Sequence, residues 1–149
     1  MKKSTILVTG GAGFIGSHLC DILLAQGHNV VALDNLRNGS LENIENALAN
    51  TSFRFIEGDI LDKETCKQAA KDVEYVYHLA CLGVRHSLHS PFENHRVNAE
   101  GTLNVLEAVL EVKVKNFYYI STSEVYGKTT IFPITEQSPT LPTTVYGAS

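Results

Sequence analysis

A glycine-rich run near the start of the chain has the residue types and the spacing that bind a dinucleotide. Gly10, Gly13 and Gly16 lie in the run Gly-Gly-Ala-Gly-Phe-Ile-Gly, which satisfies both common spacings of the dinucleotide fingerprint. Without side chains, this backbone can turn tightly and approach a pyrophosphate closely. The N–H groups of the helix that opens at Phe14 and Ile15 would then face the phosphates, where the helix dipole favours negative charge.

An acidic residue follows at the position that this fingerprint requires. Asp34 ends a second β-like run, Val-Val-Ala-Leu-Asp, and follows Gly16 at about the 20-residue distance expected for the residue that binds ribose. A carboxylate there accepts hydrogen bonds from the ribose hydroxyls and repels a 2′-phosphate, so we predict NAD in preference to NADP. An unrelated glycine-rich turn would explain the glycines, but not the strand, helix, strand and aspartate in order.

The composition is that of an ordinary globular domain. The 149 residues are 44% hydrophobic and 19% charged, with a formal net charge of −4, so we expect one compact domain over residues 1–149. The acidic balance argues against a nucleic-acid or anionic-membrane partner. No run is long enough to span a bilayer, and the first residues resemble no signal peptide. We therefore expect a cytoplasmic protein.

The elements that position these residues follow from the hydrophobic pattern. Strands are predicted at 4–9, 30–34, 53–56, 75–79 and 116–121, and helices at 14–26, at 41–48, after Asp62 and at 92–111. The last helix is apolar on more than one side, so we expect it to be buried against both the sheet and another helix. This alternation predicts an α/β Rossmann-type, doubly wound parallel sheet with strand order 3-2-1-4-5. Residues 127–144 form a long, proline-containing loop, which in compact domains is often functional.

The cysteines and histidines show no metal-binding pattern. Cys20, Cys66 and Cys81 lack ligand spacing and fit reduced thiols, the first two at apolar helical positions where they pack in the core. His86 and His89, with a later histidine, lack a fourth ligand, so we predict no metal.

Several further motifs occur in a set order. They are Gly58-Asp59-Ile60, His78-Leu79-Ala80, Asn98, Ser121-Thr122-Ser123-Glu124-Val125-Tyr126-Gly127 and Tyr146-Gly147-Ala148-Ser149. On these residues the chain resembles the NAD-dependent epimerase/dehydratase family, the extended short-chain dehydrogenases/reductases that act on nucleotide sugars. The resemblance covers the cofactor-binding half and little more, so the chain is expected to be an N-terminal portion that lacks the C-terminal substrate-binding region.

The resemblance implies further cofactor contacts. It places Asp59 and Ile60 at the adenine, and Leu79 and Ala80 beside the cofactor. Asn98 has either a cofactor or proton-relay role or that of a buried amide satisfied by backbone. The predicted NAD-binding residues are Gly10, Gly13, Phe14, Ile15, Gly16, Asp34, Asn35, Asp59, Ile60, Leu79, Ala80 and Asn98.

The resemblance also implies a catalytic tyrosine. In the family, a tyrosine takes the proton from the sugar 4-hydroxyl while hydride leaves C4, and a lysine four residues later lowers the phenol pKa from its ordinary value of about 10. No tyrosine in this sequence has such a lysine, and only for Tyr146 does that position lie beyond Ser149. Tyr146 is therefore the predicted catalytic tyrosine, and this chain alone is expected to be inactive.

The reaction class stays open. Thr122 matches the family's catalytic Ser or Thr, and Glu124 matches a carboxylate that dehydratases and decarboxylases use at C5 or C6. Ser123 replaces the aspartate of typical hexose 4,6-dehydratases, whereas the motif at Tyr146 is frequent among epimerases. The expected substrate is a UDP- or dTDP-hexose, with Ser87 and Arg85 as candidate contacts.

Two other functions remain as alternatives. The chain could be a short non-catalytic NAD-binding module, or an extended dehydrogenase that acts on a non-sugar alcohol. We also expect a homo-oligomer, because the fifth strand and the 92–111 helix would expose apolar surface in this chain.

Overall fold

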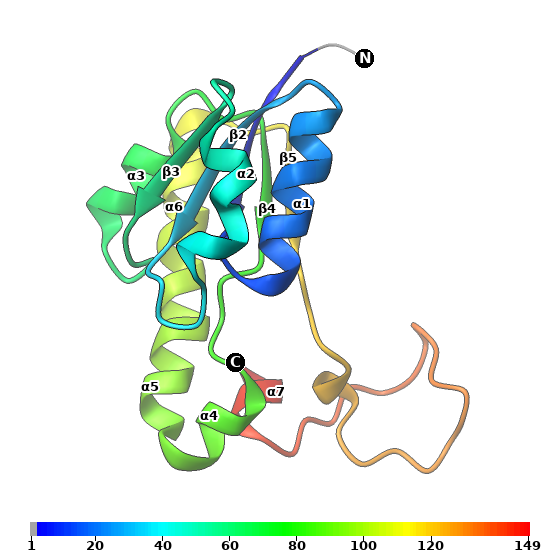
Figure 1. The fold of residues 1–149 in the computed structure, drawn as a ribbon. Coiled ribbons are helices and arrows are strands. Elements are labelled where there is room, and N and C mark those ends of the chain that lie inside the picture. The colour runs from blue at the N-terminus through cyan, green and yellow to red at the C-terminus, as the bar shows by residue number, and fades with distance from the viewer. Residues whose placement is uncertain (1–2) are drawn as a thin grey trace. The chain divides into compact units, whose positions relative to one another are not determined.

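The computed structural model describes residues 3–149 and contains a parallel sheet. Five strands are formed within this range: β1 (Thr5–Thr9), β2 (Asn29–Asp34), β3 (Phe53–Glu57), β4 (Tyr75–His78) and β5 (Asn116–Tyr119). Every neighbouring pair is parallel and the order is β3-β2-β1-β4-β5. The predicted Rossmann-type fold and strand order are confirmed, and the strand ends lie within two residues of their predicted positions (Figure 1).

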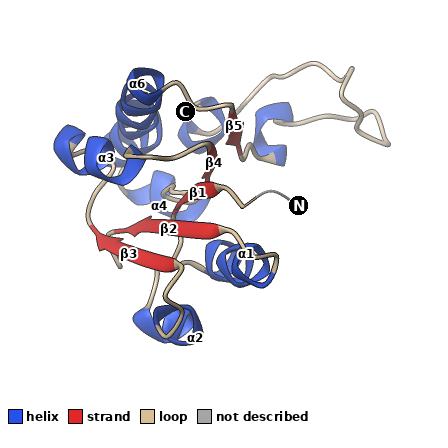
Figure 2. Ribbon diagram, turned by 90° about the horizontal axis from the view of Figure 1, so that it is seen from above, coloured by secondary structure: helices blue, strands red, loops and turns tan. Residues whose placement is uncertain are grey.

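Helical segments lie between the strands and after β5. They are α1 (Phe14–Ala25), the 3-10 helix η1 (Leu41–Ile44), α2 (Glu45–Leu48), α3 (Lys63–Ala70), α4 (Val84–His89), α5 (Pro91–His95), the π-helical turn η2 (Arg96–Gly101), α6 (Thr102–Val112), the 3-10 helix η3 (Ser123–Tyr126) and α7 (Val145–Ala148). Figure 2 shows α1 and α2 on one face of the sheet and α3 and α6 on the other. This is the doubly wound arrangement that right-handed crossovers produce.

The chain divides into two compact units. The first unit comprises residues up to Ala80 together with Gly101–Ile120, and it holds the sheet with α1, α2, α3 and α6. The second unit comprises Cys81–Glu100 and Ser121–Ser149. In the second unit α7 packs against α4, α5 and η3, and the long loop 127–144 forms neither helix nor strand.

The core of the first unit lies around its central strands. The apolar residues of β1 and β2 are buried on both faces, as expected for strands that have helices above and below. Cys20 and Cys66 are also buried, at 0% and 2% exposure, which confirms their predicted packing role. No helix formed by residues 3–149 combines the length and the apolar composition that crossing a bilayer would require.

The predicted 92–111 helix differs from the observed structure in two ways. It is interrupted by η2, a π-helical turn, and Gly101 at the end of that turn lies so close to Ile60 that a Cβ would be 2.6 Å from the Ile60 side chain. Val105 is buried as expected, whereas Leu103 and Leu110 are 54% and 74% exposed. α6 packs against α3, as expected of a helix that is buried against another helix. The expectation was wrong only for Leu103 and Leu110, which lie outside the buried stripe of Val105, Ala108 and Val109.

Candidate functional site

The glycine run forms a tight turn between β1 and α1, in which Gly10 and Gly16 occupy positions that suit only glycine. Gly10 has a φ of +69°, in the left-handed region, and its N–H donates to the Leu33 carbonyl over 2.8 Å. A Cβ on Gly16 would lie 2.1 Å from the Gly10 carbonyl oxygen. The first turn of α1 therefore packs directly on the backbone of the loop, which is the close approach that a pyrophosphate site needs.

The start of α1 suits an anion. Gly13 precedes the helix and has no side chain that could cap it, and the first turn contains no acidic residue. Phe14 and Ile15 are 79% and 65% exposed, so they lie at the surface beside this turn. The first-turn N–H groups and the helix dipole together attract negative charge, so these residues fit a pyrophosphate.

The Asp34 carboxylate lies at the carboxyl end of β2, where it holds the glycine loop. Its Oδ2 accepts the Ala12 N–H over 3.0 Å, and its Oδ1 accepts the Leu36 N–H over 2.8 Å. The side chain is 9% exposed. Because a carboxylate offers about four acceptor positions, these two bonds leave capacity for the two hydroxyls of a ribose. The site thus fits NAD on its own geometry.

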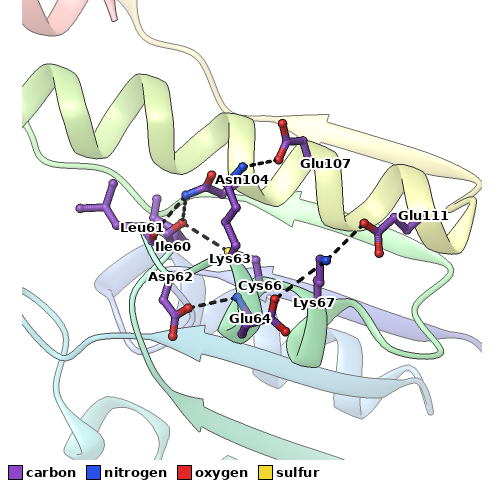
Figure 3. Close-up of polar contacts among 10 residues, drawn as sticks. All are labelled: Ile60, Leu61, Asp62, Lys63, Glu64, Cys66, Lys67, Asn104, Glu107 and Glu111. Atoms are coloured by element: carbon purple, nitrogen blue, oxygen red, sulfur yellow. Dashed lines mark hydrogen bonds and ion pairs between the residues drawn. The ribbon is translucent and has the colours of Figure 1, made fainter.

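The segment after β3 is held beside the end of β2. Asn35 Nδ2 donates to Asp59 Oδ2 over 2.9 Å, and the other Asp59 oxygen accepts the Leu61 N–H over 2.9 Å. From α6, Asn104 Nδ2 donates to the carbonyls of Ile60 and Leu61 over 3.0 and 3.2 Å (Figure 3). The predicted adenine contacts Asp59 and Ile60 therefore sit on a fixed backbone.

Sequence reasoning missed Asn104, although one signal marks it. An amide that lies between Leu103 and Val105 in an apolar helix must find hydrogen-bond partners if it is buried. Figure 3 also shows an outer layer of exposed ion pairs between α3 and α6, Lys63 with Glu107 at 2.8 Å and Lys67 with Glu111 at 3.5 Å.

A buried histidine joins β4 to β1 and α6. The Thr9 hydroxyl oxygen accepts the N–H groups of Leu79 and Ala80, both over 3.2 Å, and lies 2.7 Å from His78 Nδ1. His78 Nε2 lies 2.9 Å from the Thr102 hydroxyl oxygen, so both ring nitrogens have a hydrogen-bond partner. Burial lowers the pKa of His78 to about 4. A neutral His78 therefore holds the Thr9 hydroxyl, which in turn fixes the backbone at Leu79 and Ala80.

In the second unit, two candidate catalytic segments lie together. The Thr122 hydroxyl accepts the Glu124 N–H over 3.3 Å and caps η3. The Glu124 carboxylate accepts the Thr144 hydroxyl over 3.4 Å, and Thr144 in turn accepts the Gly147 N–H over 3.0 Å, which caps the helix that carries Tyr146. The structure thus connects the Thr122–Glu124 turn to the helix of Tyr146.

Tyr146 has a side-chain neighbour that the sequence did not predict. Its hydroxyl is hydrogen-bonded to the Cys81 side chain. Desolvation raises the pKa of the Cys81 thiol, and the hydrogen bond with Tyr146 partly offsets this. Cys81 was recognised in the sequence only as a reduced thiol, because nothing local connects it to a residue so distant in the chain.

Asn98 makes the contacts of a buried amide. Its Oδ1 accepts the Leu82 N–H over 2.8 Å and its Nδ2 donates to the Leu82 carbonyl over 3.0 Å. Asn94 donates to the same carbonyl over 2.7 Å. The two amides hold the backbone that precedes α4, and a cofactor or proton-relay role of Asn98 remains a prediction.

The remaining candidates lie on α4 and η3. Ser87 is buried and its hydroxyl donates to the Val84 carbonyl over 2.7 Å, whereas Arg85 and Ser123 are exposed. Their substrate and catalytic roles remain predictions. His86 pairs with Glu93 at 3.0 Å, and across residues 3–149 no three His, Cys, Asp or Glu side chains cluster in a way that could hold a metal ion.

Comparisons with known proteins give relatives over nearly the whole chain. The family described as GDP-mannose 4,6 dehydratase matches residues 7–149. A protein named putative UDP-glucose 4-epimerase, from Methanocaldococcus jannaschii, is 39% identical over 147 residues, which are 97% of this chain and 47% of that protein.

Solved structures with a similar fold include an epimerase and a dehydratase of nucleotide sugars. A UDP-N-acetylglucosamine 4-epimerase from Methanobrevibacter ruminantium M1 superposes with a TM-score of 0.92 at 34% identity, covering 99% of this chain and 47% of the other. The dTDP-glucose 4,6-dehydratase DesIV from Streptomyces venezuelae, which was solved with NAD bound, gives 0.91 at 34% identity, covering 97% and 47%. The chain spans about half the length of the relatives that it matches. By fold, motif order and a family match over residues 7–149, this chain belongs to the GDP-mannose 4,6 dehydratase family, the NAD-dependent epimerases and dehydratases of nucleotide sugars.

Proposed function

We propose that this chain is the cofactor-binding part of an enzyme that oxidises C4 of a UDP- or dTDP-hexose as its first step. The observation that carries the proposal is the hydrogen-bonded link between the Thr122–Glu124 turn and the helix of Tyr146. It connects, within one compact unit, the two segments that carry the hydroxyl, carboxylate and phenol that such chemistry uses. Relatives named as UDP-glucose 4-epimerases and as a dTDP-glucose 4,6-dehydratase support the substrate class.

The first unit would bind and orient NAD. The loop at Gly10 and the first turn of α1 would hold the pyrophosphate. The Asp34 carboxylate would accept hydrogen bonds from both ribose hydroxyls. Asp59 and Ile60 would line the adenine, on the backbone that Asn104 fixes. When it is bound, NAD supplies the acceptor for the hydride that leaves C4.

The second unit would carry the residues that transfer protons to and from the sugar. Tyr146 would take the proton of the sugar 4-hydroxyl, and Thr122 would donate a hydrogen bond to the same oxygen. The bond from the Glu124 N–H uses a lone pair of the Thr122 hydroxyl and not its hydrogen, so that hydrogen stays available for donation. Glu124 would act after C4 is oxidised, as base for the C5 proton or on the C6 substituent. Epimerisation, dehydration and decarboxylation differ only in this later stage.

The variant Glu124→Gln tests this assignment in the product of the whole reading frame that encodes the chain. It keeps the size of the side chain and removes the charge, so it should still reduce NAD when a UDP- or dTDP-hexose is added. Release of the final product should fall about 100-fold, the usual cost of losing a general base. Glu136→Gln, at an exposed carboxylate in the 127–144 loop of the same unit, is the matched control.

Three outcomes would redirect the proposal. Unchanged product formation in Glu124→Gln would indicate simple 4-epimerisation. Binding of NAD by calorimetry without its reduction by any sugar would indicate a non-catalytic NAD-binding module. Reduction of NAD by alcohols that carry no UDP or dTDP would indicate a dehydrogenase that acts on non-sugar substrates.

A further inference from the structure

We propose that Thr144 is a positioning residue that sets the Glu124 carboxylate against the helix turn of Tyr146. The inference rests on the proposed function, because it concerns two residues that we assign to that reaction. Thr144 lies two residues before Tyr146 and 20 residues after Glu124, and it contacts both segments through one hydroxyl.

The hydroxyl of Thr144 can serve both partners at once. Its oxygen accepts the Gly147 N–H over 3.0 Å, and its hydrogen points to Glu124 Oε2 over 3.4 Å. The Gly147 N–H can only donate, so it uses a lone pair of the Thr144 oxygen and leaves the Thr144 hydrogen for Glu124 Oε2. The same hydroxyl therefore orders the first turn of α7 and orients the carboxylate.

The backbone of Gly147 packs directly against the backbone of Glu124. A Cβ on Gly147 would lie 2.6 Å from the Glu124 carbonyl oxygen and 3.2 Å from the Glu124 Cβ. That carbonyl also accepts the Gly127 N–H over 3.1 Å, which closes the turn of η3. The helix of Tyr146 thus rests on the main chain of Glu124, while Thr144 holds its side chain.

The loop between Glu124 and the helix of Tyr146 has no regular structure, so the Thr144 hydrogen bond matters for how these two segments are positioned. Residues 127–144 form neither helix nor strand and are mostly exposed. No helix or strand within these residues therefore fixes the position of Glu124 relative to Tyr146. Catalytic groups that are misplaced by about 1 Å can lose 100-fold in rate, so the contact across the base of the loop bears directly on turnover.

The test compares Thr144→Val with Thr144→Ser in the product of the whole reading frame. Valine keeps the shape of the side chain but removes the hydroxyl, whereas serine keeps the hydroxyl. We expect Thr144→Val to lower kcat for product formation about 10-fold with KM for the nucleotide sugar unchanged, and Thr144→Ser to restore it. NAD affinity should not change. Thr143→Val, at the adjacent exposed threonine, is the control.

A second measurement does not depend on turnover. Amide hydrogen exchange at Gly147 should be about 5-fold faster in Thr144→Val, because the helix loses its cap, and unchanged in Thr144→Ser. Faster exchange without a change in kcat, or a change in neither, would overturn the positioning role and leave the proposed function standing. Absence of turnover in the wild-type protein would overturn the proposed function, and the exchange rate would then still decide whether Thr144 holds Gly147.

Discussion

Asp34 has two tasks at the scale of the single residue, since it holds the glycine loop and faces the predicted ribose. Its carboxylate accepts the N–H groups of Ala12 and Leu36. In Asp34→Asn one of the two oxygens becomes a donor, so the ribose loses an acceptor and a 2′-phosphate meets less repulsion. We expect NAD to bind the wild-type protein more tightly than NADP, and the variant to lose about 10-fold in NAD affinity, the cost of a hydrogen bond to a charged group.

Calorimetric titration of both cofactors measures this difference. In Asp34→Asn the affinity for NADP should fall less than the affinity for NAD, so the preference for NAD over NADP becomes smaller. Glu45→Gln, at an exposed carboxylate on α2, is the charge-matched control and should leave both affinities unchanged. Equal binding of NAD and NADP to the wild-type protein would contradict the role of Asp34.

At the scale of elements, His78 makes the attachment of β4 to β1 and α6 sensitive to pH. Its pKa lies at about 4 in the folded protein, below its ordinary value of 6.5, because the neutral ring is buried. The unfolded chain therefore binds a proton below pH 6.5 that the folded protein does not take up until about pH 4. The free energy of unfolding should fall over this range by up to about 3 kcal/mol.

Urea unfolding between pH 4 and pH 7 tests the histidine. In His78→Gln the fall in stability over this range should become shallower, although the variant starts from a lower stability. His18→Gln, at an exposed histidine on α1, should keep the wild-type slope. The same slope in all three proteins would exclude His78 as its source.

The α3–α6 layer provides a second prediction at this scale. Asn104 satisfies two backbone carbonyls after β3, so Asn104→Ala should lower the free energy of unfolding by about 1–3 kcal/mol. It should also weaken NAD binding, because Ile60 loses its support. Lys63→Ala removes only an exposed ion pair from the same two helices and should leave the denaturant midpoint unchanged. Equal losses of stability in Asn104→Ala and Lys63→Ala would contradict the prediction that the buried amide contributes more than the exposed ion pair.

At the scale of the whole molecule, exposed apolar residues predict self-association. Leu103 and Leu110 of α6 are 54% and 74% exposed, and β5, the last strand of the sheet, is followed by Ile120 at 49%. Apolar surface and an open strand edge both favour contact with another chain. We expect light scattering to give a dimer or larger species, and the double variant Leu103→Glu, Leu110→Glu to be monomeric.

The control for association is Leu48→Glu. This residue of α2 is also half exposed, at 49%. The helix α2 lies on the opposite face of the sheet from α6 (Figure 2). It should not change the association state. A monomeric wild-type protein at high concentration would refute the prediction.

Local patterns in the sequence determined the elements, their order and the main part of the predicted cofactor site. Apolar periodicity reports which face of a strand or helix is buried, so the five strands and the burial of Cys20 and Cys66 could be predicted. The glycine run and Asp34 could be recognised because their roles depend on backbone freedom and charge at fixed spacing. The candidates Thr122, Glu124 and Tyr146 came from the resemblance to a family and not from such patterns.

Only the tertiary structure decided which side chains hold the predicted sites. Thr9 meets His78 across 69 residues, Asn104 meets Ile60 across 44, and Thr144 meets Glu124 across 20. A hydrogen bond requires two atoms to approach within about 3 Å in a suitable direction. Periodicity determines which face a residue lies on, but it does not determine which distant residue stands opposite. These contacts, like the π-helical turn before α6, are therefore decided by how the folded elements pack.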